Sequence, residues 1–180
     1  MDAKSCIIGR RSIRKFEGKA VPREVLEEIV SMSAYAPSWK NSQTARYIAI
    51  TDPAVKERVV NEGLSIFPHN QEIVGGAPVL ILLTTVDNRA GYERDGSFTT
   101  SKGTHWQSFD AGIAAEAFCL AAYEMGLGTV ILGIYEEDKV KAAADVPEGQ
   151  SVSALIALGY PAEEPKAPKR KETGELLSFR

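Results

Sequence analysis

Apolar residues along the chain follow two spacings, and together they predict a mixture of helices and strands. Val25, Ile29 and Met32 recur at helical spacing after Pro22, which predicts an amphipathic helix there. The run from 78 to 86 is apolar without polar alternation, so we expect a strand buried on both faces. Further helices are expected over 3–8, from Asp52-Pro53 onward and over 136–144, and further strands over 47–51, 129–132 and 152–158.

The strongest helical prediction covers 109–125, which is rich in alanine and carries only three charges, Asp110, Glu116 and Glu124. A helix that is apolar nearly all round must be buried on most sides. It should therefore be central to the domain or packed against a second subunit. Gly126-Leu127-Gly128 follows it and is interpreted as the helix C-cap rather than a nucleotide-binding glycine motif.

Two segments give weaker signals. The pattern over 63–76 assigns no element, whereas 87–107 is a long polar connection that is more typical of a lid or a binding loop than of a linker. The order of strands and helices indicates an α+β or mixed three-layer fold within one domain, 1–180.

Composition narrows the classes of function. The 180 residues are 44% hydrophobic and 25% charged, and the net charge of −3 argues against nucleic acid as a partner. The longest apolar run, 77–83, is too short to span a membrane, and Arg10 and Arg11 interrupt any signal-peptide core. Cys6 and Cys119 are expected to be reduced, buried thiols of a cytoplasmic protein.

Positive charge is concentrated at two places. The segment 10–16, here called the basic stretch, has cations at four of seven positions, and a second cluster spans 166–171. Repulsion among these cations must be offset by solvent or by an anion, and arginine forks suit phosphate. A solvated basic face is the alternative for either cluster alone. A phosphate held by both would tie the tail to the N-terminal helix.

The chain contains no conventional catalytic motif. There is no Gly-x-Gly-x-x-Gly after a strand, no Walker loop and no Gly-x-Ser-x-Gly elbow, and His69 and His105 lack metal-ligand spacing. We therefore expect no metal site, and any enzyme activity would rely on a bound cofactor. The loop 37–43 offers polar groups suited to orienting a planar ring, and Trp39 in it could stack or simply cover apolar surface.

Five motifs, in order over nearly the whole chain, resemble the FMN-dependent nitroreductase family. They are the basic stretch, Ala36-Pro37-Ser38 through Asn41 and Gln43, Asp110 through Ala115, Gly126-Leu127-Gly128-Thr129 through Gly133, and Leu158-Gly159-Tyr160-Pro161 with Lys169-Arg170-Lys171. Each motif alone is weak, but five in register are specific. The resemblance implies a nitroreductase-like three-layer α-β-α fold with a central, mainly antiparallel sheet. It also implies a domain-entwined homodimer with FMN at the subunit interface.

The resemblance assigns cofactor contacts by position. The family positions that contact the flavin's phosphate, ribityl chain and pyrimidine edge are matched here by Arg10, Arg11, Ser12 and Arg14. The positions in the tail that complete the phosphate site are matched by Lys169, Arg170 and Lys171. The loop that reaches the flavin from the other subunit is matched by Pro37, Ser38, Trp39, Asn41 and Gln43. Leu132 and Gly133 match residues at the ring's reactive edge, and Asn70 matches a polar contact there.

The implied activity is ping-pong hydride transfer from NADH or NADPH through flavin N5 to a nitroaromatic, quinone or related acceptor, with no catalytic side chain. Family relatives that use reduced flavin for dehalogenation or flavin fragmentation, and a low-turnover flavin-binding protein, remain alternatives. Leu132 stands where some relatives carry an acidic residue, which leaves the choice of nicotinamide open. Tyr92, Phe98 and Trp106 are candidate acceptor-pocket residues or ordinary packing within 87–107.

Overall fold

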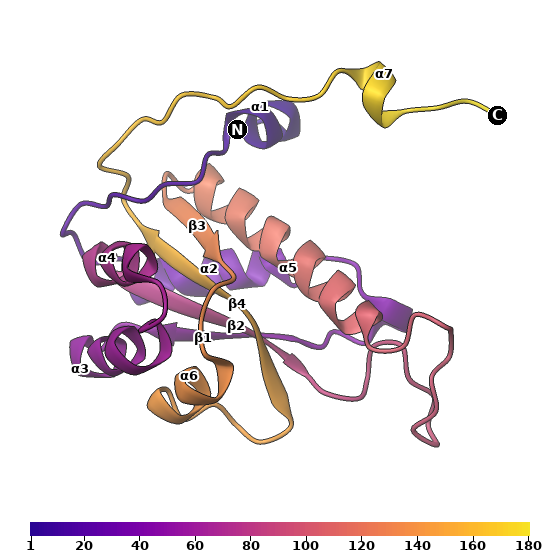
Figure 1. Cartoon of the computed structure of the whole chain (residues 1–180). Helices are drawn as coiled ribbons and strands as arrows, with labels where there is room; N and C mark the ends of the chain where they lie inside the picture. Colours follow the sequence, from indigo (N-terminus) through magenta and orange to yellow (C-terminus); the bar gives the residue numbers. More distant parts are fainter.

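The computed structural model describes residues 1–180, and its centre is a sheet of four strands (Figure 1). The strand order is β1-β2-β4-β3, and every neighbouring pair is antiparallel. The strands are β1 (Ala45–Ile50), β2 (Val79–Val86), β3 (Gly128–Leu132) and β4 (Gln150–Gly159). The expected antiparallel sheet is thus confirmed, and β3 forms one of its two edges.

The apolar run that forms β2 is buried on both faces of the sheet, as its sequence predicted. Ile81 and Leu83 belong to the core on one face, while Leu80 and Leu82 belong to the core on the other. Consecutive side chains of a strand point to opposite faces. A strand covered by packed layers on both sides therefore has no position at which a polar residue would meet water.

Two helices, α2 (Arg23–Ser33) and α5 (His105–Glu124), cover the first face of the sheet. The largest fully buried side chain there is Phe118 of α5, whose ring stacks on Tyr47 of β1 at a centroid distance of 5.2 Å. Small alanine side chains let α5 approach both the sheet and α2. This helix is central to the fold, in agreement with its apolar circumference.

The opposite face carries α3 (Pro53–Arg58), its continuation as a π turn (Val59–Gly63), α4 (Pro68–Gly76) and α6 (Glu137–Ala143). The Asp52 carboxylate accepts a hydrogen bond from the Ala54 N–H at 2.8 Å, which caps α3 as the Asp-Pro pair predicted. Helices therefore lie on both faces of the sheet, which makes three layers.

Three elements differ from the sequence prediction. The segment 63–76, to which the sequence assigned no element, contains α4. The helix α5 begins at His105 rather than at 109, so the long connection that was expected over 87–107 ends at 104. The tail contains a one-turn helix, α7 (Thr173–Leu176), that was not predicted and that Glu172 and Glu175 close with reciprocal side-chain caps.

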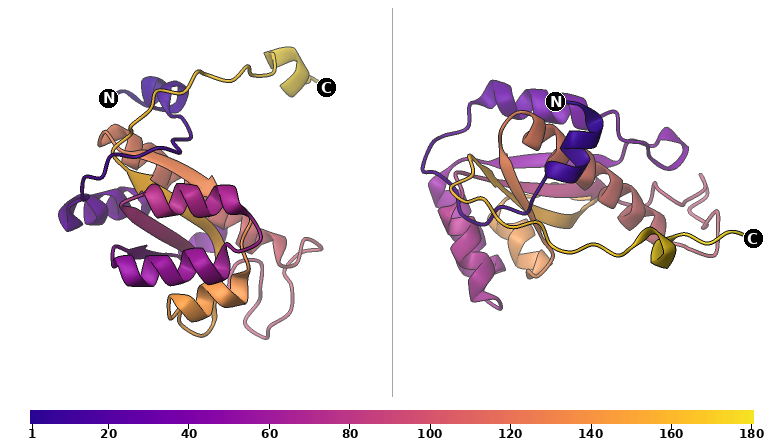
Figure 2. Two further views of the ribbon diagram at one scale, coloured as in Figure 1. Left: turned by 60° about the vertical axis from the view of Figure 1, so that its left-hand side comes forward. Right: turned by 90° about the horizontal axis from the view of Figure 1, so that it is seen from above.

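The N-terminal helix and the C-terminal tail lie on the same side of the molecule, but the two chain ends are well separated (Figure 1). The first helix, α1 (Ala3–Gly9), sits beside α5, and in both views of Figure 2 the C-terminal tail leads away from the sheet and its helices. All residues from 166 to 180 are exposed. None of the helices combines the length and apolarity that a membrane crossing requires.

Candidate functional site

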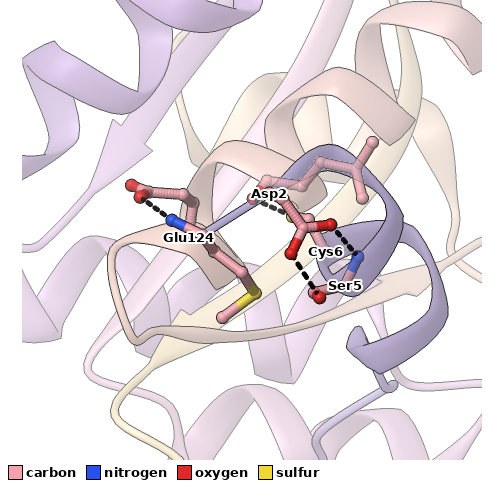
Figure 3. Close-up of polar contacts among 6 residues, drawn as sticks. Asp2, Ser5, Cys6 and Glu124 are labelled. Carbon is pink, nitrogen blue, oxygen red and sulfur yellow. Dashed lines mark hydrogen bonds and ion pairs between the residues drawn. The ribbon is translucent and has the colours of Figure 1, made fainter.

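The helix that precedes the basic stretch is fixed to α5. The Asp2 carboxylate accepts hydrogen bonds from the Ser5 backbone and hydroxyl at 2.9 and 2.7 Å, which closes the first turn of α1 (Figure 3). The N-terminal ammonium pairs with Glu124 of α5 at 3.1 Å, and the Cys6 thiol donates to the Leu120 carbonyl at 3.4 Å. The start of the basic stretch therefore has a defined position on α5.

The basic stretch then runs along the free edge of β3. The Ile13 N–H donates to the Thr129 carbonyl at 2.9 Å, and Ser12 forms a parallel bridge with the same residue. Ile13 is buried against Gly128, where an added Cβ would lie only 2.6 Å from the isoleucine side chain. Glycine at this position is what allows the backbone of the basic stretch to approach the sheet.

The far side of the basic stretch is held by the segment that follows β4. The Ala162 N–H donates to the Lys15 carbonyl and the Glu17 N–H donates to the Tyr160 carbonyl, both at 2.9 Å. Backbone hydrogen bonds on both sides thus fix the path of the chain. The side chains that leave it, rather than the backbone, are free to meet a ligand.

One of the predicted phosphate ligands, Arg11, is engaged within the chain. Its guanidinium donates to the carbonyls of Ile8, Gly9 and Arg10 at 2.7, 3.2 and 2.8 Å. These are the carbonyls that the end of α1 leaves without helical partners, and a cation there is favoured by the helix dipole. Arg11 therefore caps α1.

The other two arginines of the basic stretch retain free donors. Arg10 reaches Glu116 of α5 at 3.7 Å, too long for a hydrogen bond, and its buried Nε has no hydrogen-bond partner. Arg14 is exposed and makes one long contact, 3.5 Å, with the Ser12 carbonyl. A buried guanidinium donor without a partner is unusual and calls for a ligand or water.

A carboxylate beside the basic stretch was not anticipated from the sequence. Glu163 accepts hydrogen bonds from the backbone N–H groups of Arg14 and Lys15 at 2.6 and 3.2 Å. Two successive N–H groups that converge on one oxygen form a small anion-binding concavity. No local signal could have shown this contact, because it joins positions 148 and 149 residues apart.

The predicted ring-edge residues gather at the other end of β3. The Asn70 side chain is buried and donates to the Ile134 carbonyl at 3.0 Å, next to Leu132 and Gly133. From Thr129, beside the basic stretch, to Leu132 the strand rises about 10 Å. The structure therefore brings the basic stretch, Asn70 and the end of β3 to one edge of the sheet.

The loop 37–43 lies elsewhere, against the first turns of α5. The Trp39 N–H donates to the Asp110 carboxylate at 2.9 Å, and its ring lies 4.5 Å from that of Trp106. Burial raises the pKa of Asp110, and the hydrogen bond from the Trp39 N–H opposes that shift. The sequence analysis assigned Asp110 no function of its own, although a carboxylate in so apolar a helix was a usable signal.

The backbone of this loop is held in an uncommon conformation. Lys40, Asn41 and Gln43 have φ of 46°, 53° and 47°, in the left-handed region that residues with a Cβ seldom adopt. The Gln43 N–H donates to the Ser38 hydroxyl at 2.9 Å, which helps to hold the turn. Strain of this kind persists where the surrounding structure enforces it, and it is frequent at binding sites.

The tail cluster meets the basic stretch only at its first residue, because Lys166 lines a pocket of about 680 Å³ together with Arg11 and Ile13. Lys169, Arg170 and Lys171 are fully exposed and form no hydrogen bond or ion pair. A cavity of about 470 Å³ between α5 and the β3–β4 edge includes Glu116, the partner of Arg10, but none of the predicted site residues. The predicted site is therefore divided into three groups: the β3 edge, the loop 37–43 and the tail.

Comparison with known proteins decides the family. The pattern of the nitroreductase family matches residues 7–68 and 65–160. The chain belongs to the nitroreductase family. Within it, the chain is similar to a candidate NADH dehydrogenase/NAD(P)H nitroreductase of Methanothermobacter thermautotrophicus, with 31% identity over 92% of this chain and 80% of the relative. An NADH dehydrogenase of Thermus thermophilus is 29% identical over 91% of this chain and 89% of its own length.

Solved structures of nitroreductase-family proteins share the fold. One from Clostridium novyi has a TM-score of 0.78 at 30% identity and covers 93% of this chain and 89% of its own. A candidate nitroreductase of Desulfovibrio desulfuricans, solved in complex with FMN, has a TM-score of 0.74 at 26% identity and covers 100% of this chain and 98% of its own. The recognition made from five sequence motifs is confirmed, and the protein is a nitroreductase-like oxidoreductase.

Proposed function

We propose that the protein is an FMN-dependent oxidoreductase that takes hydride from NADH or NADPH and passes it to a nitroaromatic, quinone or related acceptor. The observation that carries this proposal is the edge of β3. Cationic side chains with unsatisfied donors lie at one end, and Asn70, Leu132 and Gly133 lie about 10 Å away at the other.

The residues at this edge fit the shape and charge of FMN. Its phosphate lies at one end of an elongated molecule and its planar ring at the other. Arg10 offers a buried Nε without a partner, and Arg14 offers an exposed guanidinium beside Ser12. Arginine forks bind phosphate in a bidentate way. Because Arg11 already caps α1, we assign the direct phosphate contacts to Arg10 and Arg14, and to Arg11 mainly the positioning of this segment.

The bound flavin would supply the redox chemistry, accepting hydride at N5 and returning it to the acceptor in a ping-pong cycle. The protein's own residues would bind, orient and tune. Cationic side chains near the pyrimidine edge would stabilise negative charge on the reduced ring. Asn70 and the backbone at Gly133 would fix the ring edge, and no side chain need act as a nucleophile.

We further propose a homodimer in which the loop 37–43 and the tail of each chain complete the site of the other. In the single chain the loop 37–43 contacts α5 instead of the β3 edge, and Lys169, Arg170 and Lys171 make no hydrogen bond or ion pair. Apolar side chains are also more than two-fifths exposed on α1, α5, the β3 edge and the tail: Ile7, Ile8, Phe109, Ile131, Ile134, Leu176, Leu177 and Phe179. Light scattering should give twice the chain mass, and a monomer that binds FMN normally would overturn the shared site.

A visible spectrum tests the function most directly. The purified full chain, loaded with FMN, should be yellow, and anaerobic NADH or NADPH should bleach it. A matched preparation of Arg23→Gln, which removes an exposed arginine of α2 remote from the β3 edge, should behave in the same way. A preparation that does not retain FMN, or that binds FMN without any bleaching by either nucleotide, would refute the proposal. A product screen with the reduced protein would then separate nitro and quinone reduction from dehalogenation and flavin fragmentation.

A further inference from the structure

A second cavity lies away from the β3 edge, between the loop 37–43, the end of β2 and the turn over 88–96. It has a volume of about 670 Å³, within the range of small-ligand sites. None of its walls belongs to the basic stretch, to Asn70 or to the end of β3. Trp39 and Gln43 in its lining belong to the loop that we assign to the flavin site of the other chain, so the cavity adjoins that site. Its arginines have no contact assigned to FMN.

The lining of this cavity is strongly cationic. Lys40, Arg46, Arg89 and Arg94 line it, and Glu93 is the only carboxylate among the lining residues. Glu93 pairs with the Lys40 ammonium at 3.1 Å, and Arg46 donates to the carbonyls of Gln43 and Ala45, both at 2.8 Å. Arg89 and Arg94 therefore remain as the arginines of this cavity without a partner in the chain. A chain with a net charge of −3 has no general reason to gather three arginines around one cavity. Their mutual repulsion would be relieved by an anion.

Buried polar groups in the same wall lack partners. Thr44 is only 2% exposed, and its hydroxyl has no hydrogen-bond partner. The indole N–H of Trp39 is also buried and unpaired. Both residues line the cavity. Buried donors without partners are rare because each loses its hydrogen bonds to water, so these two groups mark the wall of the cavity as an unusual environment.

The backbone around the cavity is also unusual. Three lining residues, Lys40, Gln43 and Asn88, have left-handed φ of 46°, 47° and 57°. They come from two separate segments of the chain, so one tight turn does not account for them. Backbone strain maintained on both sides of one cavity is characteristic of ligand-binding sites.

We propose that this cavity binds the phosphate groups of a nucleotide. Arginine is the residue best suited to phosphate oxygens, because its planar fork presents paired donors. The rings of Trp39 and Tyr92 in the walls offer apolar surface to a base. That the nucleotide is the NAD(P)H donor itself rests on the proposed function, whereas phosphate recognition by Arg89 and Arg94 does not.

Calorimetric titration of the full chain tests the proposal with three probes, ADP, pyrophosphate and adenosine. ADP should bind most tightly, pyrophosphate more weakly and adenosine least, and ADP binding should weaken as salt is raised. The double variant Arg89→Gln/Arg94→Gln should lose about tenfold in ADP affinity for each guanidinium that contacts phosphate. Its FMN content should equal that of the wild type. Arg23→Gln, which removes one positive charge from the exposed face of α2, should bind ADP normally.

The outcomes separate this site from the flavin site. ADP affinity that is unchanged in the double variant, or no ADP binding by the wild type, would overturn the proposal while leaving FMN uptake and bleaching intact. Loss of FMN together with ADP in the double variant would also overturn it, because the cavity would then belong to the flavin site. Equal binding of pyrophosphate and ADP would assign the cavity to a free phosphate anion and reject the nucleotide. Failure to take up FMN would refute the proposed function without affecting the ADP titration.

Discussion

The substitution Gly128→Ala tests whether the basic stretch must lie against β3. A Cβ at this position would be 2.6 Å from Cγ1 and 2.7 Å from Cβ of Ile13. Rotation of the isoleucine side chain cannot move its Cβ, so the backbone of the basic stretch must shift away from the strand. The hydrogen bond from the Ile13 N–H to the Thr129 carbonyl, 2.9 Å long, would lengthen at the same time.

Two effects set the expected magnitude. Overpacking a buried position costs about 1–3 kcal/mol, and a weakened backbone hydrogen bond adds about 1 kcal/mol. The melting temperature should therefore fall by roughly 5–15 °C for a chain of this length. FMN affinity should fall as well, because Ser12 and Arg14 move with Ile13. Thermal unfolding followed by circular dichroism, and calorimetric titration with FMN, measure the two effects.

Gly75→Ala is the matched control, because an added Cβ there meets no atom within 4 Å and its φ is not positive. Its stability should change by less than about 1 kcal/mol, with FMN affinity unaltered. In the double variant Gly128→Ala/Ile13→Ala, the close contacts of the new Cβ with Cγ1 and Cγ2 of Ile13 are gone. The loss of stability in the double variant should therefore be smaller than the sum of the losses in the two single variants. Strict additivity, or a Gly128→Ala protein with wild-type melting and FMN binding, would refute the packing of Ile13 on Gly128.

Three further predictions concern single contacts. Arg10→Ala combined with Lys169→Ala should weaken FMN binding by about 1.5–3 kcal/mol for each lost charge-assisted contact, and unchanged affinity would contradict the phosphate assignment. Burial raises the pKa of Asp110 above its ordinary 3.8, so the native state holds this proton longer than the unfolded state does. The wild type should therefore lose stability relative to Asp110→Asn as pH rises above 3.8. If the urea unfolding midpoints of the two proteins change with pH in the same way, the raised pKa is refuted. Tyr135→Phe removes the hydroxyl that donates to the Val152 carbonyl at 2.7 Å and should cost about 1–2 kcal/mol in urea unfolding, whereas an unchanged midpoint would show that water replaces it.

The elements that the sequence predicted best are those in which burial and periodicity agree. The apolar run of β2 and the alanine-rich sequence of α5 are each compatible only with a buried position, and the sequence predicted both elements correctly. The helix α4 was missed because it is short, begins at Pro68 and ends in two glycines, and only Asn70, Ile73 and Val74 of it are buried. The early start of α5 at His105 depends on the contact of Trp106 with Trp39, which no local pattern records.

The sequence predicted which residues form the candidate site, but not which hydrogen bonds and ion pairs they make. The motifs identified the basic stretch, yet the structure shows that Arg11 caps α1, whereas Arg10 keeps an unpaired Nε. The partners of the site residues are distant in sequence, as with Trp39 and Asp110, which are 71 positions apart. Arg11 is engaged locally by the three carbonyls that precede it, whereas the position of Arg10 depends on the distant Glu116 of α5.

The geometry of α5 explains why one chain holds the parts of the site separately. The loop 37–43 is bound to Asp110, and Arg10 reaches Glu116, six positions further along the same helix. Six residues advance an α-helix by about 9 Å and leave the two side chains about 120° apart around its axis. The loop and the basic stretch therefore meet different faces of α5, and the buried helix stands between them. In the homodimer that we propose, a ligand that contacts both groups would receive one of them from the other copy of the chain, while the backbone of the loop is anchored on Asp110.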